Sequence, residues 1–243
     1  MEEKKLEHIA FIMDGNGRWA KARGQVREYG HKFGMQALER VLSACRARGI
    51  GTVTVYAFST ENWKRPRREV ETIVRLLGTY VDKSMKELEE NRLRYRFIGD
   101  LSVFSEKLRS KMELLEVRSA GYTDMLNIAV NYGGRAELAH AFEKLAAAGK
   151  THITEEDISD ALYTSGSPDP DLMVRTGGEY RLSNFLTWQT VYSELYFTDV
   201  FWPDFDEEEL DRAIQSYKGR SRRFGGLNPE VQTKKGDASE NRR

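Results

Sequence analysis

The first group of residues that could do chemistry follows a short apolar run. Residues 9–13 lead directly into Asp14-Gly15-Asn16-Gly17-Arg18-Trp19, and Arg27 and His31 come next along the chain. Two glycines let the backbone turn tightly and offer N–H groups to an anion, and the helix expected to follow adds a favourable dipole. A carboxylate beside a diphosphate is repulsive unless a cation lies between them, so Asp14 is a candidate magnesium ligand. The spacing therefore predicts a phosphate site.

A second polar group follows the next apolar run, residues 53–58. The loop after it combines hydroxyl, carboxylate, amide, indole and guanidinium groups within a few positions. The candidate residues are Ser59, Thr60, Glu61, Asn62, Trp63 and Arg65. A parallel sheet places its reacting groups in such a loop, directly after a buried strand. The alternative is a solvated loop with an aromatic plug.

Arginines and glycines dominate the third group, residues 175–185. Arg175 and Arg181 flank a glycine pair, and Leu182 and Ser183 follow. Planar guanidinium donors and free backbone amides suit phosphate oxygens. This group is therefore a second candidate phosphate site, with surface salt bridges as the alternative.

Sequence patterns for a dedicated metal centre are absent. The chain has no Asp-Asp-x-x-Asp box, and its four histidines show no pair at zinc-ligand spacing. Glu194 stands among aromatic and apolar neighbours, where a carboxylate needs a cationic partner or a metal. Asp14 and Glu194 are thus the two candidate ligands, and Mg²⁺ is the cofactor that the sequence indicates.

The elements that must position these groups alternate between two patterns. Continuous apolar runs typical of strands buried on both faces are residues 9–13, 53–58, 93–98, 125–130 and 172–174. Helical patterns cover residues 31–48, ending at Gly49, and an apolar stripe over residues 70–88. This alternation predicts an α/β fold with a central, mostly parallel sheet flanked by helices. Because ligands bind at the carboxyl ends of such strands, we expect the three polar groups to converge there.

Composition and charge narrow the class of protein. The chain has 243 residues, 40% of them hydrophobic, and its 38 basic and 38 acidic residues give a net charge of zero. Neutrality argues against a nucleic-acid partner. No apolar run could span a membrane and the N-terminal segment lacks a signal-peptide core, so we expect a cytoplasmic protein. The single cysteine, Cys45, excludes an internal disulfide and is expected to be buried in a helix. We predict one catalytic domain over residues 1–226 and a disordered tail over residues 227–243.

The motifs together resemble a known family. Residues 8–20, 56–63, 131–135, 175–185, 194–197 and 202–205 are similar to motifs of the bacterial cis-prenyltransferases, the family of undecaprenyl diphosphate synthase, and occur in that family's order. The resemblance implies a parallel sheet with an open apolar tunnel, assembled as a homodimer. It also implies elongation of farnesyl diphosphate by isopentenyl diphosphate, with cis double bonds, to make the undecaprenyl carrier for cell-wall synthesis. The product would pass to the membrane, with the protein cytoplasmic or peripheral at the membrane's inner face.

The resemblance assigns roles residue by residue. Asp14 would hold magnesium, and Glu194 would complete that site from its own or the neighbouring subunit. Gly15, Asn16, Gly17, Arg18, Arg27 and His31 would bind the allylic diphosphate; Trp19, Ser59, Thr60, Glu61, Trp63 and Arg65 would line the substrate groove; and Arg175, Arg181, Leu182 and Ser183 would bind isopentenyl diphosphate. Asn62 matches the residue assigned to proton removal, but an amide is a poor base, so we give it an orienting role.

Two further assignments follow from the resemblance. Residues 223–225 resemble a C-terminal element that closes over the phosphates across the dimer. The helix over residues 70–88, with Ala57, Leu93 and Leu126, is the candidate tunnel wall, although ordinary core packing explains its apolar stripe equally well.

The same residues would also fit other functions. A strand-to-helix turn capped by Asp14, or a dinucleotide-binding fingerprint at Gly15, Gly17 and Ala20, would also fit the first group. The fingerprint predicts an acid at the end of the second strand, but the first acid there is Glu61, in the loop. A non-catalytic partner subunit would be expected to lack the aspartate that this chain has at position 14. Synthases of medium-length or longer cis-polyprenyl chains stay open as alternatives.

Overall fold

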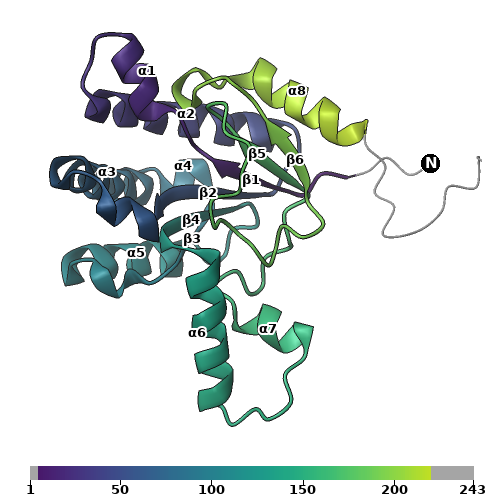
Figure 1. Ribbon diagram of the computed structural model, residues 1–243. Helices are drawn as coiled ribbons and strands as arrows, with labels where there is room; N and C mark the ends of the chain where they lie inside the picture. Colours follow the sequence, from purple (N-terminus) through teal and green to yellow (C-terminus); the bar gives the residue numbers. More distant parts are fainter. Residues whose placement is uncertain (1–4, 220–243) are drawn as a thin grey trace, which may run out of the picture.

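A parallel sheet organises the chain. The computed structural model describes residues 5–219. Six strands follow the order β3-β4-β2-β1-β5-β6, and every neighbouring pair is parallel (Figure 1). The strands are β1 His8–Ile12, β2 Thr52–Ser59, β3 Arg94–Ile98, β4 Met125–Tyr132, β5 Leu172–Arg175 and β6 Glu194–Phe197. The predicted fold class, a parallel sheet flanked by helices, is confirmed.

Five of the six strands coincide with the predicted apolar runs to within two residues at either end. The exception is β6, whose first residue is the polar Glu194 and whose four residues are all half-buried. An edge strand with one partner lacks the continuous apolar pattern of a central strand. The sequence marked this segment for its chemistry and not as a strand.

Helices connect the strands and cover the sheet. The α-helices are α1 Asn16–Ala22, α2 Arg27–Ala47, α3 Arg67–Lys86, α4 Leu88–Asn91, α5 Glu106–Ser119, α6 Gly134–Ala147, α7 Glu155–Ala161 and α8 Glu207–Lys218. Short 3₁₀ helices are η1 Thr60–Lys64, η2 Leu101–Val103 and η3 Trp202–Asp204. Both predicted helices are present, with different bounds. The first, α2, begins four residues earlier than predicted, at Arg27; the second, α3, begins at Arg67 and ends at Lys86, so the predicted single helix over residues 70–88 is divided and Leu88 belongs to α4. Gly49 has a φ of 73°, the left-handed conformation expected after that helix.

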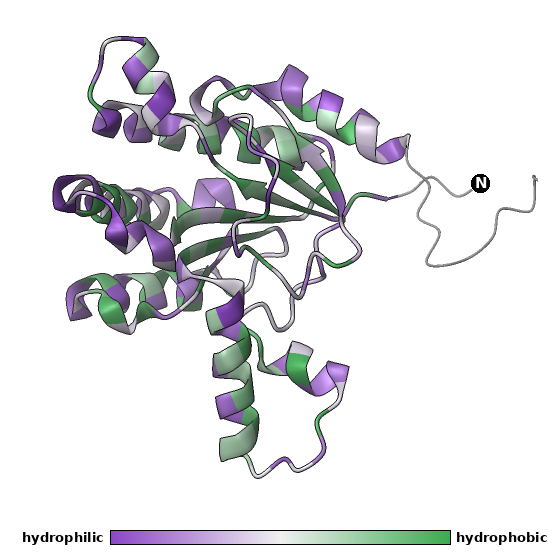
Figure 2. Ribbon diagram, in the orientation of Figure 1, coloured by the Kyte–Doolittle hydropathy of each residue, from purple (hydrophilic) through white to green (hydrophobic). Residues whose placement is uncertain are grey.

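The core lies between the sheet and a layer made by α2, α3, α5 and α8. Val41, Val81, Met112 and Ala213 each contribute a fully buried side chain to it. Figure 2 shows the apolar strands at the centre, and α6 and α7 projecting from the body of the molecule. Cys45 is fully buried and unpaired, as predicted, and burial raises the pKa of its thiol to about 12. The thiol is therefore not a nucleophile.

A buried polar network crosses the opposite face of the sheet at β1, β2 and β4. His8, which is 1% exposed, has Nδ1 2.7 Å from the carbonyl oxygen of Pro168 and Nε2 2.8 Å from Oγ1 of Thr54. The carbonyl can only accept, so Nδ1 donates and Nε2 accepts from the Thr54 hydroxyl. That hydroxyl in turn accepts from Nδ2 of Asn127 at 3.0 Å. The network thus requires a neutral imidazole.

We expect this imidazole to make the fold sensitive to mild acid. Burial lowers the pKa of His8 to about 4, whereas an unfolded histidine titrates near 6.5. Between these two pH values His8 is protonated in the unfolded chain but not in the native one. The free energy of unfolding therefore falls as pH decreases from about 6.5 to 4, by at most about 3 kcal/mol. Urea unfolding at pH 7 and pH 5 should show this dependence reduced in His8→Gln and preserved in His152→Gln, a change of an exposed histidine. An unchanged pH dependence in His8→Gln would contradict the assignment.

Candidate active site

A cavity of about 560 Å³ lies at the carboxyl ends of β2, β1 and β5. The structure brings residues of all three predicted polar groups to its wall. These are Asp14, Gly15, Asn16, Gly17, Arg27, His31, Ser59, Glu61, Asn62, Arg65, Arg175 and Ser183. The topology explains this meeting, because β1 lies between β2 and β5 and parallel strands end at one edge of the sheet.

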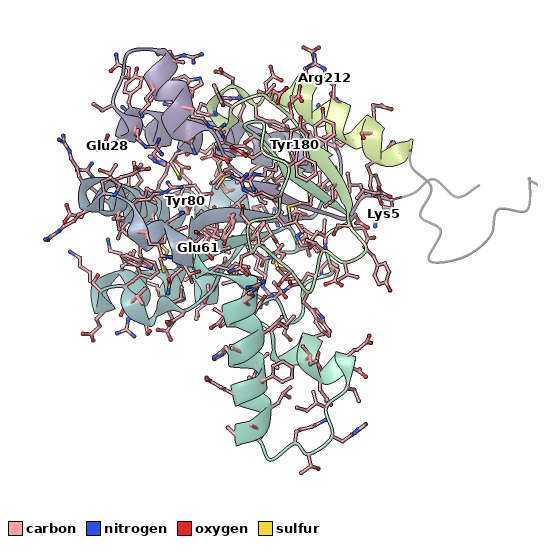
Figure 3. All side chains as sticks on the ribbon, in the orientation of Figure 1. Lys5, Glu28, Glu61, Tyr80, Tyr180 and Arg212 are labelled. Carbon is pink, nitrogen blue, oxygen red and sulfur yellow. The ribbon has the colours of Figure 1, made fainter. Side chains whose placement is uncertain are left out.

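The inner part of the same cavity is apolar. Ile73, Leu76, Leu77 and Tyr80 form a stripe along α3, and Met35 and Leu38 face the cavity from α2. Figure 3 labels Tyr80, on α3, and Glu61, just after β2. Ala57 also lines the cavity, as predicted, whereas Leu93 and Leu126 are buried in the core and are not part of the wall. One continuous space therefore joins a polar mouth to a hydrocarbon-like interior.

Asp14 is the carboxylate at the centre of the mouth. Its Oδ2 accepts from Nη2 of Arg175 at 3.0 Å, and its Oδ1 accepts from the Gly15 N–H and lies 3.2 Å from Nη2 of Arg18. Burial would raise the pKa of Asp14, but the bond from Arg175 and the charge of Arg18 outweigh burial and hold the pKa below its ordinary value. Asp14 is therefore ionised at neutral pH.

Arg175 is a buried cation with three hydrogen-bond partners and one unpaired N–H. Only 4% of the residue is exposed, and it donates to Oγ of Ser183 at 2.7 Å, to the carbonyl oxygen of Arg181 and to Asp14. Its buried Nε has no hydrogen-bond partner within residues 5–219. Buried donors are normally paired, so an unpaired guanidinium N–H beside a cavity fits an anionic ligand.

Two glycines make the first polar group possible. Gly15 has a φ of 103°, which residues with a side chain rarely adopt. A Cβ on Gly17 would lie 2.5 Å from Cζ of Arg27, so glycine here lets that guanidinium lie against the turn. The turn and the arginine are thereby packed together at the mouth.

Glu69 contacts three predicted site residues, namely Arg27 and His31 of the predicted allylic diphosphate site and Arg65 of the predicted substrate groove. This carboxylate is 4% exposed and accepts from Nε of Arg27 at 3.0 Å and from Nη1 of Arg65 at 3.0 Å, and it lies 3.2 Å from Nε2 of His31. The bond to His31, with the charges of Arg27 and Arg65, lowers the pKa of Glu69 to about 2 against the cost of burial. The carboxylate thus fixes the three side chains along one wall of the cavity.

We expect Glu69→Gln to lower the free energy of unfolding at pH 7 by about 1–3 kcal/mol, because the cations lose their charged acceptor. A carboxyl whose pKa is depressed contributes its stability above the unfolded value, about 4.5, and loses it as pH falls through about 2. The difference in the free energy of unfolding between the parent and Glu69→Gln should therefore decrease as pH falls from 4.5 to 2. Urea titrations across this range measure it, with Glu71→Gln as the exposed control on the same helix. A pH-independent difference would exclude this role of the charge.

Several predicted residues lie beside the cavity and not in its wall. Trp19 is buried against Phe33 and donates from Nε1 to Asp204, and Trp63 donates from Nε1 to Asn131 at 2.8 Å. Two arginines also lie outside the wall: Arg18 pairs with Asp14 and Glu179, and the exposed Arg181 pairs with Glu179. Leu182 packs against the apolar cluster on one face of the sheet, and Thr60 is half-buried in η1. Their predicted roles toward substrate stay predictions.

Glu194 lies far from Asp14 within the chain. It opens β6 in register with Leu172, which pairs with Ile9, whereas Asp14 follows the other end of β1. Glu194 therefore does not join the mouth of its own chain, and its metal role requires a neighbouring subunit. Residues 223–225 and the tail over residues 227–243 lie outside the described residues.

The mouth of the cavity suits a magnesium ion that is held mainly by substrate phosphates and water, with one carboxylate from the protein. Among residues 5–219 no group of three histidine, cysteine, aspartate or glutamate side chains could hold a metal. Mg²⁺ is commonly bound by one or two carboxylates together with substrate phosphates and water. Asp14, ionised and at the mouth, supplies such a carboxylate.

A comparison with protein families identifies the class of protein. Residues 12–225 match the family described as "Putative undecaprenyl diphosphate synthase". The chain belongs to this prenyltransferase family. The three polar groups and the cavity that they surround are therefore parts of a prenyltransferase.

Relatives of known name support the assignment. An isoprenyl transferase of Fusobacterium nucleatum is 50% identical to this prenyltransferase over 228 residues, covering 93% of this chain and 99% of its own. An enzyme of Vibrio vulnificus named ditrans,polycis-undecaprenyl-diphosphate synthase ((2E,6E)-farnesyl-diphosphate specific) is 46% identical over 236 residues, or 94% of each chain.

Solved structures share the fold of this prenyltransferase. Lavandulyl diphosphate synthase from Lavandula x intermedia, in complex with dimethylallyl diphosphate, superposes with a TM-score of 0.85 at 34% identity, covering 90% of this chain and 98% of its own. A probable undecaprenyl diphosphate synthase from Campylobacter jejuni gives a TM-score of 0.78 at 34% identity, covering 91% and 99%. The cis-prenyltransferase fold expected from the motifs is thereby confirmed.

Sequence reasoning missed two residues of the prenyltransferase site. Glu69 stands four residues after Arg65 in the first turn of α3, a spacing that predicts the Arg65 ion pair but not the contacts with Arg27 and His31. Asn184 lines the cavity directly after Ser183, and only its place within the third polar group pointed to it.

Proposed function

We propose that this prenyltransferase extends farnesyl diphosphate with successive molecules of isopentenyl diphosphate, forming cis double bonds, to give undecaprenyl diphosphate for cell-wall synthesis. One observation carries the proposal: a single cavity has a cationic mouth at Arg27, Arg65 and Arg175 and an apolar interior along α3. A diphosphate with a growing hydrocarbon tail has the same division into a charged head and an apolar body.

The two substrates would occupy the two sides of the mouth. Residues 15–18 with Arg27 and His31 would bind the allylic diphosphate, and Arg175, Arg181 and Ser183 the isopentenyl diphosphate. Departure of diphosphate leaves negative charge on oxygen and positive charge on carbon, and the arginines would stabilise the former. Holding both diphosphates in fixed places would align the isopentenyl double bond with that carbon. The new C–C bond would replace the broken C–O bond, and the proton lost from the isopentenyl unit would pass to the released diphosphate.

Asn62 would orient substrate and not remove the proton. Its Oδ1 accepts from the Ser59 N–H at 3.1 Å, in a capping arrangement that closes the turn of η1. The amide oxygen is thereby occupied within the loop, while Nδ2 can donate to a substrate oxygen. This arrangement supports a donor that positions a diphosphate.

Magnesium would lie between Asp14 and the diphosphate of the allylic substrate. When bound, the ion supplies positive charge against the diphosphate leaving group. The part of the chain itself is to hold Asp14 ionised through Arg175 and Arg18. Glu194 would reach the site from the neighbouring subunit of a homodimer.

A homodimer would form along β6. No strand pairs with its outer edge among residues 5–219, and Tyr180 and Val191 near it are 70% and 67% exposed. Such an edge with apolar neighbours favours an interface between copies.

No helix within residues 5–219 is long and apolar enough to cross a membrane. We propose that residues 1–226 form one catalytic domain and that the hydrocarbon product carries the enzyme to the membrane's inner face.

The test is a single incubation. The full-length protein with Mg²⁺, farnesyl diphosphate and labelled isopentenyl diphosphate should yield a polyprenyl diphosphate, whose length mass spectrometry gives. A C55 product is the expected result. A shorter or longer cis product would reassign the chain length, and absence of any product with the pure protein would favour a non-catalytic partner subunit.

A further inference from the structure

Asn184 joins three loops at the mouth of the cavity. Its Nδ2 donates to Oε1 of Glu61 at 3.1 Å, in the loop after β2. Its Oδ1 accepts from the Arg135 N–H at 2.9 Å and its carbonyl oxygen from the Gly134 N–H at 2.7 Å, at the start of α6. Both bonds satisfy N–H groups that have no partner within the helix. The segment after β5 is thereby tied to the ends of β2 and β4.

The backbone at this junction is held in an uncommon conformation. Ser183, Asn184 and Leu186 have φ values of 50°, 63° and 45°, in the left-handed region. Such φ values are energetically unfavourable for residues other than glycine, and they persist where several surrounding contacts hold the backbone in place. A Cβ on Gly133 would lie 2.7 Å from Nδ2 of Asn184, so the loops pack too closely there for a side chain. The conformation is thus set by the contacts of Asn184 with neighbouring loops.

This geometry fixes Ser183, the residue that precedes Asn184 in the chain. The carbonyl oxygen of Ser183 accepts from the hydroxyl of Tyr56 at 3.5 Å, and its Oγ accepts from Arg175 at 2.7 Å. Arg175 then reaches Asp14. A displacement of Asn184 would therefore be passed to the cation that the proposed function assigns to isopentenyl diphosphate.

On the other side, Asn184 acts on the loop that carries Asn62. Burial would raise the pKa of Glu61, but hydrogen bonds, first among them that from Asn184, hold it below its ordinary value. Glu61 is therefore a charged acceptor, and its bond to the amide is of the stronger kind. β1 separates β2 from β5 in the sheet, so their end loops have no direct strand pairing between them. The Glu61–Asn184 bond spans that gap.

We infer that Asn184 is a positioning residue for the condensation: it sets the distance between the loop after β2, which carries Asn62, and the isopentenyl diphosphate site after β5, and so holds Asn62 in place against the bound substrate. This inference rests on the proposed two-substrate reaction. It predicts an effect on kcat, because misplacing a reactant by about 1 Å can cost about 100-fold in rate while each diphosphate still binds.

The first experiment separates positioning from stability. Asn184→Ala should lower kcat by about 10- to 100-fold, with both KM values changing less than about threefold. Arg92→Ala is the matched control, because Arg92 is also left-handed, with a φ of 46°, and lies at the end of α4 before β3. Both variants should have a lower melting temperature than the parent, but the kcat of Arg92→Ala should equal that of the parent. A kcat of Asn184→Ala within threefold of the parent overturns the inference.

The second experiment exchanges donor and acceptor. Asn184→Asp places a second carboxylate against Glu61 and should lower kcat, whereas in the Glu61→Gln background the introduced carboxylate can accept from the introduced amide. The fold-decrease in kcat caused by Asn184→Asp should therefore be at least about tenfold smaller in the Glu61→Gln background than in the parent. Equal costs in the two backgrounds overturn the inference.

A readout without turnover separates this inference from the proposed function. Amide hydrogen exchange of residues 60–65 and 134–136 should accelerate in Asn184→Ala and not in Arg92→Ala. Unchanged exchange overturns the role of Asn184 even if the parent makes polyprenyl diphosphate. If exchange is faster in Asn184→Ala but the parent makes no polyprenyl diphosphate, the result counts against the proposed substrates alone.

Discussion

Asp14→Asn is expected to lower kcat about a thousandfold while the protein stays folded. The amide oxygen of asparagine can still accept from Arg175, whose Nη2 lies 3.0 Å from Oδ2 of Asp14. The charge that would hold magnesium is lost, and removing one electrostatic element of a transition-state site costs about 10²- to 10³-fold. Steady-state rates with farnesyl and isopentenyl diphosphate, at increasing Mg²⁺, measure the effect.

Asp14→Ala makes the matched comparison. It should be as inactive as Asp14→Asn but also less stable, by about 1–3 kcal/mol, because the buried guanidinium of Arg175 loses a partner. Urea unfolding of the two variants separates the catalytic from the structural part. Near-normal turnover in Asp14→Asn would rule out a metal role for this carboxylate.

Arg175→Lys is expected to raise the KM for isopentenyl diphosphate by about 100-fold. Lysine keeps the charge but presents one nitrogen, so it cannot contact Ser183, the Arg181 carbonyl and Asp14 together as the guanidinium does. Lysine also lacks the Nε donor, which has no partner within residues 5–219, and the loss of about one to two charged hydrogen bonds to the diphosphate, at about 1.5–3 kcal/mol each, is sufficient for this change. Initial rates at saturating farnesyl diphosphate give the KM.

The control for this prediction is Arg212→Lys, on the exposed face of α8, where Arg212 pairs with Glu208. That variant should behave as the parent does. If Arg175→Lys instead raises only the KM for farnesyl diphosphate, the two diphosphate sites are assigned in the wrong order.

Much of the fold could be read from hydrophobic patterns. The run that became β4 is buried at all eight positions, and burial on both faces produces a mainly apolar pattern, in which Asn127 and Asn131 are the polar exceptions. The edge strand β6 escaped prediction because half-buried positions leave no such pattern. The start of α2 was missed because its first turn, from Arg27, is polar and lies at the cavity mouth, where apolar periodicity does not apply.

The site divides in the same way. Asp14, Arg175 and Ser183 could be found because each follows a predicted strand, and a parallel sheet brings such positions to one edge. Glu69 and the bridging role of Asn184 depend on contacts across 38 to 123 positions of sequence. No local spacing encodes contacts of that range.

The sequence by itself determined the sheet, the three polar groups and the family, because these depend on local pattern and on the order of motifs. Only the tertiary structure decided which groups share a wall, that Glu69 holds Arg27 and His31, and that Glu194 lies at the opposite edge from Asp14. The reason is physical: strand order and helix packing are set by the burial of the whole core, so distances between loops exist only once that core has formed.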